Sequence, residues 1–495
     1  MSKVARIPGY QSKNPKQNRG IIGDREIRFK CSLQNVILDV LRGRPGWTEV
    51  PGPNSQVPAA QQGTRPSNQQ TSGLTQTGNQ SRPSNTGSSQ SSNIIVPSRF
   101  SRPIQPVAPQ ATQVNAQGRL GDGDWDFYWC DREWLHQNYD TMFLHEHQKI
   151  LHFRNHYELT RKNLMVKNLK RLRKQTEREQ GKTEAQSFDF YPTTYELPSE
   201  YHIFVEEFKK NLGIIWIMKP AAKENINHYQ TRQKDVPETY VGEYQPLSDQ
   251  TRDVPETYVV QRYIENPLLI GGRKFDVRVY VLVCSYNPLK VWLYRGGFAR
   301  FSNTRFSLDS IEDTYVHLTN VAVQKNAPDY DPEKGCKWST QQLRKYLAAK
   351  HGVDKVQKMF KAIDNIIIKS LQSVQKIIIN DKHCFEMYGY DVVNRNQCFS
   401  SLTASGKEDY DLKFGLISDL LNVLDLENRL TGKEKRIGGW DLLWDDGPIV
   451  ADDNMDCTPA NGSAVSTPNS YLGCFNDRKK QLREIYLTAQ SVKKS

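Results

Sequence analysis

The run KFDVRVYVLVCS at 274–285 constrains the fold more than any other part of this sequence. Side chains alternate between the two faces of a β-strand, so one face of this run is apolar and the other is charged. The apolar face consists of Phe275, Val277, Val279, Val281 and Val283, and the charged face consists of Lys274, Asp276 and Arg278. Charges on a buried strand must be paired, because an unpaired buried charge is unstable. The run is therefore either a structural ladder of ion pairs or a polyphosphate site, in which the carboxylate serves a metal or a ribose.

Two further segments each deliver a cation on a predicted strand. IIWIMKP at 214–220 is a short apolar strand that ends with Lys219, where Pro220 interrupts regular pairing. A lysine in this place can hold a phosphate, but it can also simply extend to solvent. We expect LKVWLY and FARFS, joined by a turn at RGG, to form a hairpin over 289–302 that presents Arg300.

Polar residues that could complete a nucleotide site follow the central strand. They are His317, Thr319 and Asn320 in the polar strip YVHLTN, and Asp391 in the predicted strand 385–393. The sequence contains no P-loop, no GxGxxG that opens a helix, and no HRD or DFG series, which argues against those nucleotide-binding folds. Cations and carboxylates carried on strands favour an ATP-grasp arrangement instead.

Helical periodicity predicts the elements that cover these strands. The apolar residues of 354–379 recur at helical spacing, and 412–430 is expected to form a later helix. A short helix near 36–41 should end at Gly43 and Pro45. The aromatic segment WDFYWCDREWL, which begins at Trp125, is expected to form a strand, a turn and a helix. The predicted fold class is α+β, with a mainly antiparallel sheet and flanking helices.

Composition divides the chain into ordered and polar regions. Residues 51–120 are rich in Ser, Gln, Asn, Pro and Gly, and such a segment cannot bury enough apolar surface to offset its ordering entropy. The segment DVPETYV occurs twice, and we expect the second copy at 253–259 to be structural and the first at 235–241 to be a duplicated loop. The expected organisation is a disordered leader (1–20), the start of an N-terminal domain (21–50), a disordered insert (51–120), the rest of that domain (121–210), a central domain (211–265), a C-terminal domain (266–430) and a tail (431–495).

The net charge of +12 predicts an acidic partner, which could be a nucleic acid, an anionic membrane or an acidic protein tail. The charge is concentrated in a predicted helix at 159–180, which has one apolar stripe and few acidic residues to pair with its cations. We interpret this helix as an anion-binding surface rather than a merely solvated one. The basic residues assigned to the surface are Arg161, Lys162, Lys167, Lys170, Arg171, Arg173 and Lys174.

Other classes of protein are disfavoured. No apolar stretch approaches the roughly 18 residues that span a bilayer, and residues 1–20 have no apolar core typical of a secretion signal. The eight cysteines form no CxxC pair and are expected to be reduced thiols of a cytosolic protein. His145, His147, His152 and His156 lie close in sequence, but no nearby cysteine or well-spaced carboxylate completes a zinc site, so none is predicted.

A series of motifs resembles the tubulin tyrosine ligase-like family, in particular its polyglutamylase branch. The motifs are FYWCDREWL, HFRNHYELTRKNLMVKNLKR, WIMKP, QRYIENPLLIGGRKFDVRVYVLV, WLYRGGFARFSN, YVHLTNVAVQ, GCKWS and CFEMYGYD. They cover nearly all of the chain outside the leader and the insert.

The resemblance implies an ATP-grasp-like fold and a ligase that uses ATP and Mg²⁺. It would add free glutamate to side-chain γ-carboxylates in the C-terminal tails of tubulin through an acyl phosphate. Such a transfer needs neutralisation of charge around the phosphates and a positioned acceptor. The basic helix would then bind the acidic tubulin tail. The resemblance also points to the cytoplasm and cytoskeleton, to cilia, flagella and basal bodies, and to possible accessory subunits.

The resemblance also implies a role for each candidate residue. Lys219 would contact phosphates, and Gln261, Arg262, Tyr263 and Ile264 would form the adenine hinge. Lys274, Asp276 and Arg278 would line the nucleotide, and Arg300 would face the transferring phosphate. The pocket would be completed by His317, Thr319 and Asn320, with Asp391 as the magnesium ligand.

Two elements of the family pattern are missing from this sequence. Family members follow the lysine of WIMKP with a glycine-rich turn, but no glycine occurs from Ile214 to Val241. They also follow GYD with a strand carrying Glu-x-Asn, but no carboxylate occurs from Val392 to Lys407. Magnesium needs several oxygen ligands, and Asp391 with Asp276 would hold it poorly.

Three explanations of these losses stay open: a sequence lacking short exons, a pseudoenzyme that still binds microtubules, or a rearranged active site. The main alternative to a ligase is a non-catalytic microtubule-binding protein. Nucleic-acid binding is not predicted, because no recognisable nucleic-acid-binding module accompanies the charge. The sequence does not indicate whether a ligase of this kind would start or lengthen glutamate branches, or which tubulin it would prefer.

Overall fold

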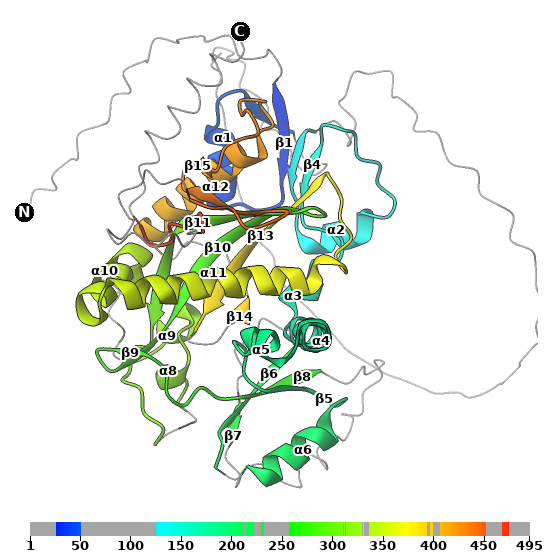
Figure 1. The fold of residues 1–495 in the computed structure, drawn as a ribbon. Coiled ribbons are helices and arrows are strands. Elements are labelled where there is room, and N and C mark those ends of the chain that lie inside the picture. The colour runs from blue at the N-terminus through cyan, green and yellow to red at the C-terminus, as the bar shows by residue number, and fades with distance from the viewer. Residues whose placement is uncertain are drawn as a thin grey trace, which may run out of the picture. The chain divides into compact units, whose positions relative to one another are not determined.

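Two β-sheets organise the chain in the computed structural model (Figure 1). The structure describes residues 26–50, 125–211, 213–221, 229–231, 257–309, 311, 313–328, 330, 336–393, 397–398, 406–451 and 468–474. Within the ordered unit, the strands are β1 Ile27–Cys31, β2 Trp47–Glu49, β3 Phe127–Trp129, β4 Lys149–Leu151, β5 Thr194–Leu197, β6 Trp216–Pro220, β7 Tyr229–Thr231, β8 Tyr258–Arg262, β9 Leu269–Ile270, β10 Arg273–Tyr286, β11 Leu289–Phe301, β12 Lys337–Ser339, β13 Cys384–Val392, β14 Gln397–Cys398, β15 Arg436–Ile437 and β16 Trp440–Asp445. The helices are α1 Val36–Gly43, α2 Arg132–Asn138, α3 Tyr157–Thr160, α4 Lys162–Gln180, α5 Lys182–Ala185, the 3₁₀ turn η1 Gln186–Phe188, α6 Tyr201–Lys210, α8 Thr314–His317, α9 Val321–Gln324, α10 Thr340–His351, α11 Val353–Gln375 and α12 Lys407–Leu424.

The larger sheet has the strand order β15-β16-β11-β10-β13-β4-β3-β1-β2, and β9, β12 and β14 pair with β10, β11 and β13. Its central pairs, β10 with β11 and β13, are antiparallel, as expected from the sequence. The pairs from β13 through β4, β3 and β1 to β2 are parallel, so the sheet is mixed although mostly antiparallel.

The alternation predicted for the central strand is confirmed. The valines and Phe275 of β10 pack into the apolar core that α11 covers, with Phe360, Ile367 and Leu371 of that helix. The opposite face of β10 contributes Tyr280 and Leu282 to a second core, which α1 and α12 cover (Figure 1). The charged residues of β10 share this second face at the other end of the strand.

The smaller sheet has the order β5-β8-β6-β7, and its pairs are antiparallel. Helix α6 packs on one face, where Phe204 and Phe208 contact Trp216 and Val260. The second copy of DVPETYV leads into β8, as expected. The first copy, the leader and the insert at 51–120 lie outside the described residues.

The hairpin predicted over 289–302 is wrong, because β11 is one continuous strand. The RGG segment is not a turn. A Cβ atom at Gly297 would lie 2.3 Å from the backbone oxygen of Arg278, so glycine lets β11 pass close to β10. The register shifts between Val279 and Val281 of β10, which absorbs the extra residues of β11 as an irregularity.

Several predicted boundaries also differ. The segment that contains His317 is not an extended strip, since α8 ends at that residue. The helix expected from residue 159 is interrupted at Arg161, whose backbone is extended, so α3 and α4 are separate. Helix α12 begins and ends about one and a half turns earlier than predicted, and α11 ends at Gln375. No helix among the described residues is both long and apolar enough to span a bilayer.

Candidate functional site

A pocket lies between the two sheets and gathers the candidate residues from distant parts of the sequence. Of the residues predicted to bind nucleotide or metal, all except Arg278 line it. The lining consists of Ile217, Lys219, Gln261, Arg262, Tyr263, Ile264, Lys274, Asp276, Arg300, His317, Leu318, Thr319, Asn320, Asp391 and Val393. The role that the sequence assigns to each residue stays a prediction, but their proximity is a structural fact.

Two buried lysines define one side of the pocket. Lys219 on β6 donates from Nζ to Gln261 Oε1 at 3.1 Å. Lys274 on β10 donates to the Tyr263 hydroxyl at 2.9 Å and to the backbone oxygen of His317 at 3.0 Å. Neither lysine forms an ion pair with a carboxylate of the described residues. This half of the pocket therefore carries positive charge without an acidic partner.

The positive charge of these lysines is electrostatically unfavourable in the ligand-free protein. Burial, with the nearby charges of Lys162 and Lys274, lowers the pKa of Lys219 to about 7. Burial lowers the pKa of Lys274 to about 8, although Asp276 opposes the shift. A bound anion would favour the charged form of both side chains.

Tyr263 connects the hinge segment to the rest of the wall. Its hydroxyl lies 2.8 Å from Nδ1 of His317, and the two rings meet edge to face. The same hydroxyl oxygen accepts a hydrogen bond from Lys274 Nζ, so this one oxygen links β10, the segment after β8, and α8. Burial raises the pKa of Tyr263, which keeps it a neutral hydrogen-bonding group.

The other side of the pocket is a network of two arginines and two aspartates, here called the charge quartet. Strand register places Asp276 opposite Arg300 on β11, and Arg278 opposite Asp391 on β13. Cross-strand neighbours of this kind are close enough to pair. Arg278 donates to both oxygens of Asp391, with Nη2 at 2.9 Å from Oδ2. Arg300 donates to Asp276 and also approaches Asp391 Oδ2 at 2.7 Å.

The charge quartet explains why Arg278 does not line the pocket. Its side chain is 5% exposed and lies against Asp391. It therefore orients the aspartate instead of reaching a ligand. Features of both interpretations of the central strand are therefore present: Lys274 lines the pocket, whereas Asp276 and Arg278 belong to an ion-pair ladder.

The pocket fits a polyphosphate better than it fits magnesium. Lys219, Lys274 and Arg300 can oppose phosphate charge from three strands. Magnesium needs near-octahedral oxygen donors with free lone pairs. Asp276 and Asp391 are both engaged by arginines, and no further carboxylate lines the described pocket. The described residues do not form a magnesium site.

The basic surface predicted on the helix is only partly exposed. Lys162 does not belong to it, because its side chain is buried and donates to the backbone oxygen of Pro220 at 3.0 Å. Lys170 pairs with Glu200, and Arg173 pairs with Asp189. The basic residues of α4 that stay exposed recur along one side of the helix: Lys167, Arg171, Lys174 and Arg178. We call these four residues the basic stripe.

Lys162 is a residue of the site region that the sequence interpretation placed wrongly. It begins α4 beside Lys219, close enough to depress the pKa of that lysine. A sequence signal existed: Lys162 precedes Met165, Val166 and Leu169 by three, four and seven residues, which is the spacing of the buried face. Ile217, Leu318 and Val393 were also missed, because apolar pocket walls resemble any other core residue in a sequence.

Comparisons with known proteins identify the family of the chain. The model of the tubulin-tyrosine ligase family matches residues 140–430. The chain is 47% identical over 505 residues to a probable tubulin polyglutamylase TTLL9 of Rattus norvegicus, covering 95% of this chain and 94% of the relative. It is 43% identical over 438 residues to a probable tubulin polyglutamylase ttll-9 of Caenorhabditis elegans, covering 85% of each. A probable alpha-tubulin polyglutamylase Ttll1 of Tetrahymena thermophila is 43% identical over 366 residues, covering 66% of this chain and 87% of the relative. The chain belongs to the tubulin-tyrosine ligase family.

Proposed function

We propose that this protein is an ATP-dependent tubulin polyglutamylase, which joins free glutamate to the γ-carboxylates of glutamates in tubulin C-terminal tails. The observation that carries the proposal is the convergence of Lys219, Lys274 and Arg300 on one pocket in a member of this ligase family. The relatives named above as tubulin polyglutamylases support the choice of substrate.

In the proposed reaction, the protein supplies binding and charge neutralisation. Lys219 and Lys274 hold phosphate oxygens, and the segment from Gln261 to Ile264 borders the base. Arg300 faces the phosphoryl group that is transferred. Transfer of the terminal phosphoryl group from ATP to the acceptor carboxylate releases ADP and forms the acyl phosphate, and attack by the amino group of free glutamate then forms the amide and releases phosphate.

The charge quartet keeps Arg300 in place for this role. Asp276 and Asp391 accept hydrogen bonds from its guanidinium group and fix the plane of that group. Arg278 donates to Asp391 and so holds this aspartate in place. His317 holds Tyr263, and through it Lys274, at the opposite wall. We derive no step through magnesium, because the described carboxylates already have arginine partners.

The basic stripe on α4 is the proposed binding surface for the acidic tubulin tail. Lys167 and Lys174 form no ion pair within the described parts of the chain, and both are exposed. Cations on an exposed helix attract a glutamate-rich segment, and the range of this attraction decreases as the salt concentration rises. We assign the protein to the cytoskeleton and, within it, to cilia or flagella, with accessory subunits as possible partners.

A second function, non-catalytic binding of microtubules, is favoured by the lack of free carboxylates in the described pocket. The two functions are separated by incubating the purified chain with microtubules, ATP and labelled glutamate. A ligase incorporates label into tubulin, and the incorporation is lost in Lys274→Ala but retained in a control variant at the exposed Lys209. Binding to microtubules without incorporation would establish the second function.

The contribution of the tail is tested in the same assay. Microtubules from which the C-terminal tails have been removed by protease should neither bind the chain nor become labelled. Binding that is unaffected by removal of the tails would contradict both functions. Calorimetry of ATP binding with and without magnesium completes the test, since a pocket that binds no ATP in a folded chain excludes the ligase.

A further inference from the structure

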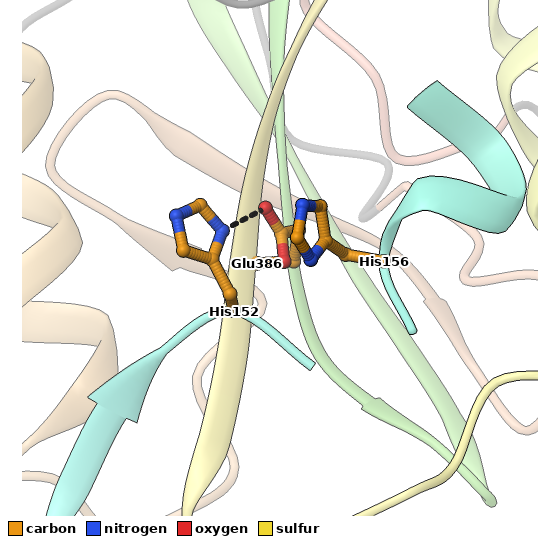
Figure 2. A group of neighbouring side chains, drawn as sticks. All are labelled: His152, His156 and Glu386. Carbon is orange, nitrogen blue, oxygen red and sulfur yellow. Dashed lines mark hydrogen bonds and ion pairs between the residues drawn. The ribbon is translucent and has the colours of Figure 1, made fainter. Parts of the chain in front are cut away.

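Two histidines and a glutamate meet on the far side of β13 from the charge quartet (Figure 2). His152 follows β4, His156 precedes α3, and Glu386 lies within β13. One potential ligand atom from each side chain lies within 4.8 Å of the others. In the part of the chain that the structure describes, this is the one group of three such side chains.

The cluster is separate from the proposed nucleotide pocket. Side chains alternate along β13, so Glu386 shares a face with Tyr388 and Tyr390, whereas Asp391 projects to the other face. None of the three residues lines the pocket. The proposed ligase reaction therefore gives the cluster no role.

Glu386 is a buried carboxylate that faces imidazoles. It is 3% exposed, and Oε1 lies 2.7 Å from Nδ1 of His152, while Oε2 accepts from the backbone N–H of Phe153 at 3.2 Å. Figure 2 shows the carboxylate beside both rings, which stack on each other with centroids 4.8 Å apart. The carboxylate is therefore buried, with an imidazole and a backbone N–H as hydrogen-bond partners.

His156 has the hydrogen-bond pattern of a metal ligand. Its Nδ1 lies 3.1 Å from the backbone oxygen of Phe153. A carbonyl oxygen only accepts, so Nδ1 carries the proton and Nε2 has a free lone pair in the neutral ring. A histidine that donates its other N–H to a backbone carbonyl is the usual arrangement around protein-bound metals.

His152 reaches the cluster from an unusual backbone conformation. His152 has a φ of 77°, in the left-handed region that residues other than glycine seldom adopt. Its N–H donates to the backbone oxygen of Phe385 at 2.9 Å, which fixes the residue beside β13. Unfavourable backbone conformations of this kind persist where the surroundings require them, often at functional sites.

We propose that His152, His156 and Glu386 bind one divalent transition-metal ion, with zinc as the ion that this donor set fits. Two imidazoles and one carboxylate form a known ligand set for zinc. Magnesium and calcium prefer oxygen ligands alone, so this donor set does not suit them. The histidines have the spacing His-x₃-His, which is common among zinc ligands. The ion ties the connection between β4 and α3 to β13.

The proposed metal site also links helix α4 to the larger sheet. Helix α3 is followed, after the extended residue Arg161, by α4, which carries both the buried Lys162 and the basic stripe. Because β13 belongs to the central sheet, the metal joins the helix to the sheet at a point outside the pocket. The ion is thus structural, and its binding does not depend on the proposed ligase activity.

The test is calorimetric titration of zinc chloride into the full chain after chelator treatment, with absorbance of the cobalt-loaded protein as a second measurement. We expect one ion per chain and ligand-field bands of a nitrogen- and oxygen-ligated cobalt. Glu386→Gln retains the shape and the ability to accept from Phe153, but it removes the charge. It should weaken zinc binding at least about tenfold. His202→Ala, at an exposed histidine of α6, is the matched control and should bind like the parent.

A second variant guards against misfolding of Glu386→Gln. His152→Asn removes a ligand, and asparagine tolerates the left-handed conformation of this position. It should also lose zinc binding and the cobalt bands. The proposal is overturned if the parent shows no saturable zinc binding, or if both Glu386→Gln and His152→Asn bind zinc as tightly as His202→Ala.

Discussion

Lys219→Met should make the ligand-free protein more stable at neutral pH, although it removes a residue of the proposed active site. Lys219 is 6% exposed, and its hydrogen-bond acceptor is the neutral Gln261. A pKa lowered from 10.5 to about 7 corresponds to about 5 kcal/mol of unfavourable free energy for the charged form in the folded state. Methionine fills a similar volume, and the loss of the hydrogen bond to Gln261 costs about 1–2 kcal/mol. The variant should therefore be more stable by a few kcal/mol at pH 7.

The pH dependence identifies the cause of this gain. Between about pH 7 and 10.5 the unfolded lysine binds a proton that the folded lysine releases, so the stability of the parent rises with pH in this window. The methionine variant has no such proton. Its advantage should be fully present below pH 7 and should shrink by about 1.4 kcal/mol per pH unit between pH 8 and 10. Above pH 10.5 the variant should be less stable than the parent by about 1–2 kcal/mol, because only the loss of the hydrogen bond to Gln261 then remains.

The assay is chemical denaturation of the parent and of Lys219→Met at several pH values, with a methionine variant at the exposed Lys209 as control. ATP should reverse the order, because phosphates favour the charged lysines. The affinity of the parent for ATP should fall from pH 7 to 9 as Lys219 and then Lys274 lose their protons. The reasoning is refuted if the stability difference between variant and parent is independent of pH, or if ATP affinity does not decrease over this range.

Three further predictions concern charged residues elsewhere. Arg295→Met should destabilise the fold by about 3–5 kcal/mol in denaturation, because it removes the bidentate partner of Asp441, which is 1% exposed and is then left with the backbone N–H of Tyr471 and with Arg436 at 4.0 Å. Asp391→Asn should retain or strengthen ATP binding measured without magnesium, since Arg300 loses a competing partner; loss of that binding would contradict the network described. Lys167→Glu combined with Lys174→Glu should weaken cosedimentation with microtubules at low salt and have little effect at high salt, and an unchanged salt dependence would remove the basic stripe from the docking surface.

The central strand could be predicted because its own residues determine its environment. The alternation of apolar residues with Lys274, Asp276 and Arg278 defines the two faces of the first half of β10, and the structure confirms that the two sets lie on opposite faces. The pocket residues could be predicted as a set through the family motifs. For β10 the residues of the strand itself are enough to predict its two faces. For the pocket, each residue lies in a motif that the sequence shares with the family.

The errors came from contacts between distant segments. The path of β11 depends on the oxygen of Arg278 on the neighbouring strand, which leaves no room for a side chain at Gly297. Lys162 is buried because the start of α4 lies against the end of β6, where its ammonium group donates to Pro220. The many charged residues around Lys162 in the sequence gave no sign of this burial. The histidine cluster lacked a carboxylate within its own segment, and Glu386 completes it from more than two hundred residues away.

The two halves of the pocket differ in a way that folding alone does not explain. On one half the arginines of the charge quartet are neutralised by Asp276 and Asp391, so their burial is compensated within the protein. On the other half Lys219 and Lys274 have only neutral hydrogen-bond partners, and burial works against their charge. A fold selected for stability alone would place methionine or leucine at these positions. Because the missing partner is negative charge and the site opens between two sheets, a bound anion is the simplest source of compensation. The lysines therefore point to ligand binding, and the quartet to the rigid wall against which that ligand is held.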